Sequence, residues 1–307
     1  MRVLITGGTG LIGSELTNSL CADAHEVIIL SRSGTSSVPL PSRATVATWD
    51  GRTAQGWGHL VNEVDAIVNL AGESIAGANP LAGRWTPARK QRILESRLQA
   101  GQAIRQALEA ATKRPEVLVQ GSAVGYYGPR GDEPITEETA PGTDFLAGLC
   151  QQWEAGAAGA EALGVRVAII RTGVVLSMGG GALPFMALPF RFFVGGPLGS
   201  GRQYVPWIHE EDQVAAIRFL IDHPGQRGVF NLSAPQPVTS EAFGKAIGRA
   251  LRRPSYMPAP AFAFRLAFGE LATLLVDGQR QIPRRLQQSG FRFKFEDIDS
   301  ALKDLLR

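Results

Sequence analysis

The sequence predicts an α/β fold built on a doubly wound parallel sheet. Three observations lead to this prediction: a short apolar run at Arg2–Thr6, three closely spaced glycines directly after it, and later apolar runs that alternate with helix-like stretches. Short apolar runs that end in turn residues are typical of strands buried on both faces. Because parallel strands need crossover connections, the alternation favours a parallel sheet with helices on both faces.

The turn after the first strand carries the strongest functional signal. Three glycines follow the strand at three-residue spacing, and a helix-like stretch from Ser14 to Leu20 comes next. In such a unit, glycine permits a tight turn, a close approach of the backbone to a pyrophosphate and close packing of helix on strand. The helix N-terminus adds free N–H groups and a partial positive charge. We therefore predict a Rossmann-type dinucleotide site rather than a plain glycine-rich turn. Its expected contacts are Gly7, Thr9, Gly10, Leu11, Ile12 and Gly13.

The end of the second predicted strand, Glu26–Leu30, distinguishes the two nicotinamide cofactors. NAD enzymes usually place an acidic residue there, whereas NADP enzymes tolerate an arginine that pairs with the 2′-phosphate. Here Ser31 and Arg32 follow the strand, and no acidic residue does. Arginine suits a phosphate because it can donate two parallel charge-assisted hydrogen bonds. The sequence therefore predicts NADP(H) as cofactor, with a solvated loop arginine as the alternative.

The glycine spacing G-x-x-G-x-x-G resembles that of the extended and atypical short-chain dehydrogenase/reductase families, which include nucleotide-sugar epimerases. A predicted third strand, 46–50, ends in Trp49 and Asp50, which either border the adenine or form a packed tryptophan and a turn aspartate. The fourth, 65–72, ends in Asn-Leu-Ala-Gly and resembles the stretch that passes along the cofactor in those families. The two charged residues that follow are either cofactor contacts or loop charges. The contacts implied here are Leu70, Ala71, Gly72, Glu73 and Arg84.

Helix ends can be located from capping residues. Thr86 followed by Pro87 predicts the start of a helix that runs to Ala111, because proline is favoured at the first helical position. A second helix is predicted from 239 to 251, and a single apolar helix from 262 to 275.

The fifth predicted strand, 116–120, leads into Gly121 and Ser122. A serine at this strand end, followed by Tyr-Gly, resembles the catalytic-serine segment of extended short-chain dehydrogenases. The resemblance implies that Ser122 hydrogen-bonds a substrate carbonyl or hydroxyl and that Gly121 lies at the cofactor. Tyr126, in the same segment, is a candidate proton donor.

The next helix departs from the usual pattern. Working members of these families carry Tyr-x-x-x-Lys there, in which the tyrosine transfers the proton and the lysine lowers its pKa. This chain has no Tyr-x-x-x-Lys; Cys150 and Glu154 stand at the same separation and share a helix face. Cys150 is a candidate weak proton donor, but a neighbouring carboxylate raises the pKa of a thiol. A small buried packing residue is the alternative.

The sixth predicted strand, 164–171, is followed by an Arg-x-Gly-x-Val segment. It resembles the segment whose backbone binds the nicotinamide carboxamide, which implies Arg171, Gly173 and Val174 as cofactor contacts. His209, in a His-x-x-Asp pattern, is expected to be structural. We predict a cofactor-binding domain over 1–175, with 205–235 returning to it, and a smaller α/β substrate lobe over 176–204 and 236–307.

Composition narrows the function classes. A net charge of +3 with no long basic run argues against nucleic acid as partner. Two cysteines are too few for a disulfide framework and favour a reducing compartment. Apolar stretches are broken well before the length of a membrane span, and no leader pattern opens the sequence, so we expect a cytoplasmic protein with no membrane partner. No metal site is predicted.

Across nearly the whole chain these motifs resemble the atypical, epimerase-like short-chain dehydrogenase/reductase family 39U. The Cys-x-x-Trp-Glu segment is itself part of that resemblance. Two functions stay open: an NADP(H)-dependent oxidoreductase or nucleotide-sugar epimerase whose proton donor is Tyr126, Cys150 or a water held by Ser122, and a non-catalytic NADP(H)-binding regulator. A small-molecule substrate belongs to the first, and by analogy extended enzymes imply a homodimer. Fold and family name alone do not establish a reaction.

Overall fold

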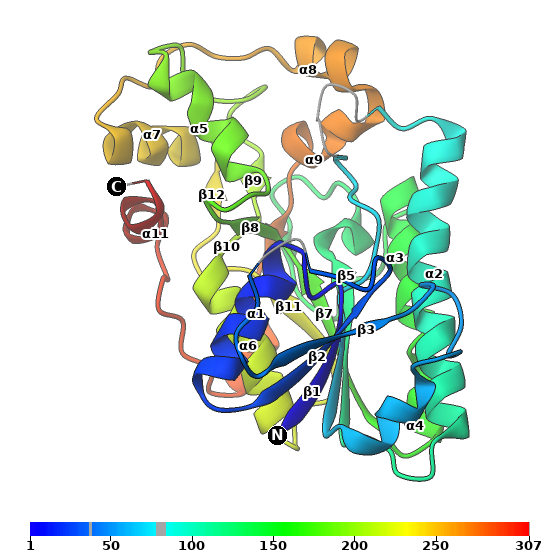
Figure 1. The fold of residues 1–307 in the computed structure, drawn as a ribbon. Coiled ribbons are helices and arrows are strands. Elements are labelled where there is room, and N and C mark those ends of the chain that lie inside the picture. Colours follow the sequence, from blue (N-terminus) through cyan, green and yellow to red (C-terminus); the bar gives the residue numbers. More distant parts are fainter. Residues whose placement is uncertain (37–38, 78–83, 307) are drawn as a thin grey trace.

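The computed structural model describes residues 1–36, 39–77 and 84–306, apart from the side chains of 267, 274 and 275. Its centre is a seven-stranded parallel sheet in the order β11-β7-β5-β4-β1-β2-β3 (Figure 1). The order reverses beside β1, which is the pattern of a doubly wound sheet and confirms the predicted fold class. The strands are β1 Arg2–Thr6, β2 Glu26–Ser31, β3 Ala44–Thr48, β4 Ala66–Asn69, β5 Val117–Ala123, β7 Arg166–Thr172 and β11 Gly228–Leu232.

Helices cover both faces of this sheet (Figure 1). Val3 and Ile5 of β1 pack with α1 and α6, whereas Leu4 packs on the other face with α2, α4 and η1. Alternate residues of one strand thus enter opposite cores, as the pleat requires. These helices are α1 Leu11–Ala22, η1 Gly58–Glu63, α2 Pro87–Ala110, α3 Phe145–Ala155, α4 Ala158–Ala162 and α6 Glu210–Asp222.

The predicted start of α2 is confirmed. The Thr86 hydroxyl accepts the N–H of Arg89 at 3.2 Å, and Pro87 occupies the first helical position. Both features satisfy or remove backbone donors that a helix start leaves unpaired. Among the described residues, no helix is long and apolar enough to cross a bilayer.

A third core lies above the carboxyl edge of the sheet and is built by α5 Leu183–Arg191, α7 Ser240–Leu251 and α11 Ile298–Leu305. Three short strand pairs join it to the sheet: β8 Val174–Leu176 with β10 Trp207–His209, β9 Tyr204–Val205 with β12 Val238–Thr239, and β6 Pro134–Ile135 with β13 Arg280–Gln281. The remaining helices are η3 Val124–Tyr127, α8 Ala261–Phe268, η4 Gly269–Ala272, α9 Thr273–Val276 and α10 Arg284–Gln288.

One helix prediction is wrong. The expected single helix from 262 to 275 is divided into α8, η4 and α9. The break falls at Gly269, whose φ of +59° lies in the left-handed region that glycine adopts without penalty. The apolar periodicity continued through this glycine and hid the break.

Candidate functional site

The glycine turn after β1 is fixed by backbone contact. A Cβ on Gly13 would lie 2.3 Å from the Gly7 carbonyl oxygen, and one on Gly7 would lie 2.9 Å from the carbonyl carbon of Leu70. Gly7 also has a φ of +70°. The cap residue of α1, Gly10, offers no side-chain hydrogen bond, and the first turn contains no acidic residue. The helix N-terminus is therefore open to an anion.

The end of β2 presents an unengaged cation. Arg32 is exposed, and within the described residues its guanidinium has neither a hydrogen bond nor an ion pair. Its Cδ lies 3.5 Å from the Cβ position of Gly51, whose φ is +77°. Ser31 is instead used locally, because its hydroxyl donates to the Thr35 carbonyl at 2.9 Å. Among the described residues, none takes up the donors of Arg32, which suit a ligand phosphate.

Trp49 and Asp50 match the packing alternative. Trp49 is buried and makes an edge contact with Trp57, with the ring centroids 5.9 Å apart. Asp50 accepts the N–H groups of Arg52 and Thr53 at 2.7 and 2.8 Å, and these hydrogen bonds lower its pKa. Both residues have a structural role at this turn.

A buried polar chain, which the sequence analysis did not single out, joins the ends of β1, β4 and β5. The Thr6 hydroxyl donates to Asn69 at 2.6 Å, and the Asn69 amide donates to Gln120 at 2.9 Å. The N–H of Ala71 in turn donates to the Thr6 hydroxyl at 3.1 Å. Satisfied buried networks of this kind fix geometry. The polar residues at the ends of otherwise apolar strands are the sequence feature from which this network could have been predicted.

Arg97 of α2 was also not predicted as a site residue. It is 6% exposed, and its guanidinium donates to the carbonyls of Glu73 and Ile93 at 3.1 and 3.0 Å. The guanidinium carbon lies 4.8 Å from the Trp153 ring and 2.8 Å from the Cβ position of Gly72. Burial lowers the pKa of Arg97 to about 10, so it stays a cation at neutral pH. The structure thus places a positive charge directly against the end of β4.

The predicted cofactor residues around this point lie close together. Trp153 also covers Gly121, where a Cβ would lie 2.9 Å from its ring. Glu73 lies 3.6 Å from Arg92 and remains partly exposed. Arg84 stands apart, with its Nε 3.4 Å from the Cβ position of Gly269 in η4.

Ser122 and Glu154 are brought together with Arg171. The Ser122 hydroxyl donates to Glu154 Oε1 at 2.6 Å, and Arg171 donates to both carboxylate oxygens at 2.8 Å. The Arg171 and Glu154 side chains are only 4% and 11% exposed. Burial is the largest single influence and lowers the pKa of Arg171, but the hydrogen bonds and charges of Glu154 and Tyr127 together outweigh it and raise that pKa above its ordinary value. The Arg171 guanidinium is thus committed to this ion pair, and a cofactor contact of Arg171 through its backbone stays a prediction.

Two tyrosines flank the ion pair. The Arg171 guanidinium carbon lies 3.3 Å from the centroid of the Tyr126 ring, and Arg171 donates to the Tyr127 hydroxyl at 3.0 Å. Tyr127 is fully buried, donates to Asn231 at 2.6 Å, and has its pKa raised to about 12 by burial. Tyr126 is half-buried, and its hydroxyl bonds to none of the residues that the structure describes. Tyr126 thus has a free phenol group.

Cys150 matches its packing alternative. It is 1% exposed, and its thiol donates to the Ala123 carbonyl at 3.7 Å. Burial, followed by the charge of Glu154, raises its pKa to about 11. A thiol that is enclosed and held protonated is a poor candidate for proton transfer to a substrate.

The segment after β7 is used inside the protein. The N–H groups of Gly173 and Val174 donate to the carbonyls of Leu232 and Pro206 at 2.9 and 2.5 Å, so neither is free to donate to a cofactor. His209 is buried, stacks on Phe295 at 3.8 Å and accepts the N–H of Glu211 at 3.1 Å, and burial lowers its pKa. These contacts agree with the expected structural role of His209.

The model of the family described as "NAD dependent epimerase/dehydratase family" matches residues 3–233, which is most of the chain. The chain belongs to the NAD-dependent epimerase/dehydratase family. A second model, a domain of unknown function (DUF1731), matches residues 259–305. The predicted epimerase-like family is thereby confirmed. Its description names a nicotinamide cofactor, and membership alone does not decide between NAD and NADP.

Relatives of this family member cover its full length. An epimerase family protein from Staphylococcus saprophyticus is 42% identical over 99% of this chain and 98% of its own. The epimerase family protein YfhF of Bacillus subtilis is 39% identical over 100% and 98%. Among solved structures, the human epimerase family protein SDR39U1 with NADPH has a TM-score of 0.86 and 35% identity, covering 100% of this chain and 99% of that chain. UDP-glucose 4-epimerase from Thermus thermophilus, at 18% identity and a TM-score of 0.73, shares the fold.

Proposed function

We propose that this protein binds NADP(H) along the carboxyl edge of β1, β2 and β4 and acts as an oxidoreductase or epimerase on a small hydroxyl or carbonyl compound. The observation that carries the cofactor choice is Arg32, an unengaged cation at the end of β2 where an NAD enzyme would place an acid. The open N-terminus of α1 suits the pyrophosphate. The human relative, whose structure contains NADPH, supports the same choice.

The cofactor contacts follow the edge from the glycine turn to the end of β4. Arg32 pairs with the 2′-phosphate. The close approach at Gly7 and Gly13 leaves space for the diphosphate, and Gly72 and Gly121 line the path to the nicotinamide ribose. Arg97, held against Gly72, supplies the positive charge that the missing lysine supplies in other family members.

Ser122 and Tyr126 are the groups available for the reaction itself. When bound, the reduced nicotinamide supplies a hydride to a carbonyl carbon. The Ser122 hydroxyl donates a hydrogen bond to Glu154, so its oxygen lone pairs stay available to accept a hydrogen bond from a substrate hydroxyl or an ordered water. The free Tyr126 phenol donates a proton to the substrate oxygen and regains one from solvent. The buried Glu154–Arg171 pair orients both groups and acts through them.

The substrate class rests on similarity. A nucleoside-diphosphate sugar epimerase structure from Corynebacterium glutamicum is 33% identical with a TM-score of 0.78, although this chain covers 58% of it. A nucleotide sugar is therefore our first choice of substrate for testing, followed by simpler carbonyl compounds.

A non-catalytic NADP(H)-binding regulator is the second candidate. The burial of Cys150, in the place of the usual tyrosine, favours it, because that position holds no group that can exchange a proton with a substrate. Such a protein would bind NADPH tightly and transfer no hydride.

The deciding experiment follows NADPH oxidation with a panel of nucleotide sugars and carbonyl compounds. We expect turnover that falls by roughly tenfold in Ser122→Ala, the size expected for one lost hydrogen bond that positions the substrate. Ser289→Ala is the matched control, since that hydroxyl bonds to Gln226 at the other end of the sheet. Equal turnover in wild type and Ser122→Ala would refute the site assignment. Tight NADPH binding without turnover on any compound would establish the regulator instead.

A further inference from the structure

Two neighbouring segments of the small lobe, 185–194 and 245–266, form an exposed surface that we call the basic apolar surface. Ten large apolar side chains are exposed among the residues that the structure describes, and nine of them lie in these two segments. Exposed clusters of this kind mark interaction sites. The nine are Phe185, Leu188, Phe192, Phe193, Val194, Tyr256, Met257, Phe262 and Leu266.

The two segments are held side by side. The Gly195 carbonyl accepts the N–H groups of both Tyr256 and Met257, at 3.0 and 3.1 Å. The guanidinium carbon of Arg253 lies 4.3 Å from the Phe193 ring. Figure 1 shows the chain leaving α7, passing α5 and reaching α8 along the outer edge of the small lobe. The exposed apolar residues of 192–194 therefore lie next to those of 256–257.

The charged residues within the two segments are all basic. These segments contain six basic residues and no acidic residue, although the net charge of the whole chain is only +3. Three of the six pair with acids from outside the surface: Lys245 with Glu241, Arg249 with Asp299, and Arg265 with Asp277. The other three, Arg191, Arg252 and Arg253, are exposed and have no carboxylate partner in the described part of the chain.

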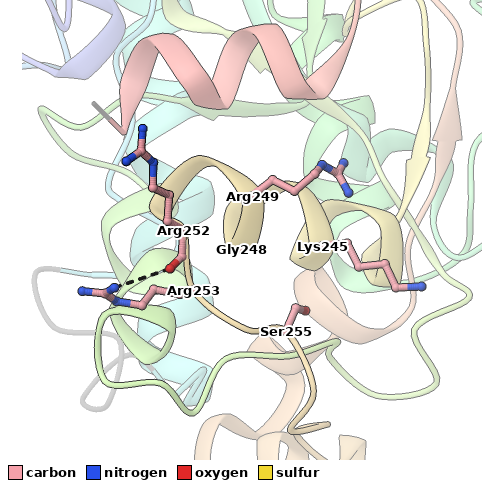
Figure 2. Close-up of a pocket in the computed structure, with 6 residues that line it drawn as sticks. All are labelled: Lys245, Gly248, Arg249, Arg252, Arg253 and Ser255. Carbon is pink, nitrogen blue, oxygen red and sulfur yellow. Dashed lines mark hydrogen bonds between the residues drawn. The ribbon is translucent and has the colours of Figure 1, made fainter.

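A cavity of about 330 Å³ lies within this surface, at the C-terminal end of α7 (Figure 2). Four of the six residues that line it are basic: Lys245, Gly248, Arg249, Arg252, Arg253 and Ser255. The Ser255 hydroxyl oxygen is buried and bonds to no described residue. The Arg252 and Arg253 guanidinium groups point outward from the rim of the cavity (Figure 2), and guanidinium groups suit a phosphate.

We propose that the basic apolar surface binds an anionic phospholipid bilayer, with its aromatic and aliphatic side chains at the acyl boundary and a headgroup phosphate in the cavity of α7. Protruding apolar side chains flanked by Arg and Lys are what an interfacial contact requires. A second copy of this chain does not fit, because a two-fold contact would bring like charges together.

This contact revises the expected absence of a membrane partner. That expectation rested on the lack of a segment long enough to span a bilayer, and a protein that lies on the bilayer needs no such segment.

The test is co-sedimentation of the full-length protein with vesicles of phosphatidylglycerol and, separately, of phosphatidylcholine. We expect binding to phosphatidylglycerol that weakens with added salt, and little binding to phosphatidylcholine. Arg252→Asn with Arg253→Gln should weaken binding roughly thirtyfold. Each basic residue near an anionic surface raises the affinity about fivefold, and this variant removes two of them. Asparagine is chosen because residue 252 has a φ of +54°, which asparagine tolerates. Phe192→Ser with Phe193→Asn should weaken it more than tenfold.

The matched control, Arg105→Gln with Lys113→Gln, removes the same charge at the far end of α2 and in the loop after it, and should change binding less than twofold. Several results would overturn the proposal: no binding to phosphatidylglycerol, equal loss in the control and the Arg252/Arg253 variant, or complete competition by glycerol phosphate at the same phosphate concentration, which would show a free-phosphate site. Binding to polyglutamate but not to vesicles would replace the bilayer with an acidic protein.

Discussion

The glycine turn after β1 and the Ser122 region at the end of β5 both lie at the carboxyl edge of the parallel sheet, yet different kinds of contact fix them. In the turn, backbone meets backbone, and a single added carbon at Gly13 would approach the Gly7 carbonyl to 2.3 Å. On α3, side chains meet side chains, and Glu154 holds both Ser122 and Arg171. The turn is thus fixed by backbone contacts, whereas the α3 face depends on three side chains. Substitutions can therefore change the two regions separately.

The largest effect should come from breaking the ion pair on the α3 side. Glu154→Leu leaves the Arg171 guanidinium buried without a counter-charge, so we expect the free energy of unfolding to fall by about 4 kcal/mol. Glu154→Leu with Arg171→Met should recover much of that loss. Denaturant unfolding of the single and double variants measures both. Glu241→Ala, which breaks an exposed pair, is the control and should change little. Equal stability of Glu154→Leu and wild type would contradict a buried pair.

A substitution in the glycine turn should lower both NADPH affinity and the free energy of unfolding. Gly13→Ala should abolish measurable NADPH binding and lower the free energy of unfolding by about 2 kcal/mol through overpacking. Gly148→Ala is the matched control, because nothing lies within 4 Å of that Cβ position on α3. It should be neutral or slightly stabilising, since alanine is the better helix former. Retained NADPH affinity in Gly13→Ala would mean that the glycine turn does not take part in cofactor binding.

Arg97 links the two regions, and its charge can be tested apart from its packing. A cation beside the nicotinamide disfavours the positively charged oxidised ring relative to the neutral reduced ring. In Arg97→Met the ratio of the Kd for NADP⁺ to the Kd for NADPH should fall about tenfold, while Arg97→Lys keeps it. Fluorescence titration of both forms gives the ratio. If both forms weaken by the same factor, Arg97 only supports the loop at Glu73.

The effect of Cys150 is confined to high pH and is therefore absent under ordinary assay conditions. The pKa of this thiol is raised to about 11, above the ordinary value of 9.0, so between these values the folded state binds more protons than the unfolded state. Its contribution to stability is complete below about pH 9 and is lost as the pH rises toward 11, with a slope of up to about 1.4 kcal/mol per pH unit. The difference in unfolding free energy between wild type and Cys150→Ala should follow that slope. A difference that does not vary with pH would indicate a thiol of ordinary pKa.

Sequence reasoning reached the sheet, its order of strands and helices, and the glycine turn, because these depend on local apolar runs and on the conformational limits of glycine. The expected place of Ser122 at a strand end is confirmed, whereas its role in a reaction stays a prediction. Sequence reasoning could not reach Arg97, because a lone arginine on a helix looks the same whether its side chain meets solvent or the end of β4. It also assigned Arg171 to the cofactor, since nothing in the spacing shows that Glu154, in the helix before, takes up its charge. The break at Gly269 was missed because apolar residues continue on both sides of it.

The most direct measurement of the central claim is a titration of wild type and Arg32→Ala with NADPH and NADH. We predict that wild type prefers NADPH and that Arg32→Ala loses roughly ten- to a hundredfold in NADPH affinity, the range for hydrogen bonds to a charged group. NADH affinity should be unchanged. Equal losses for both nucleotides, or no binding of either by wild type, would contradict an NADP(H) site at the end of β2.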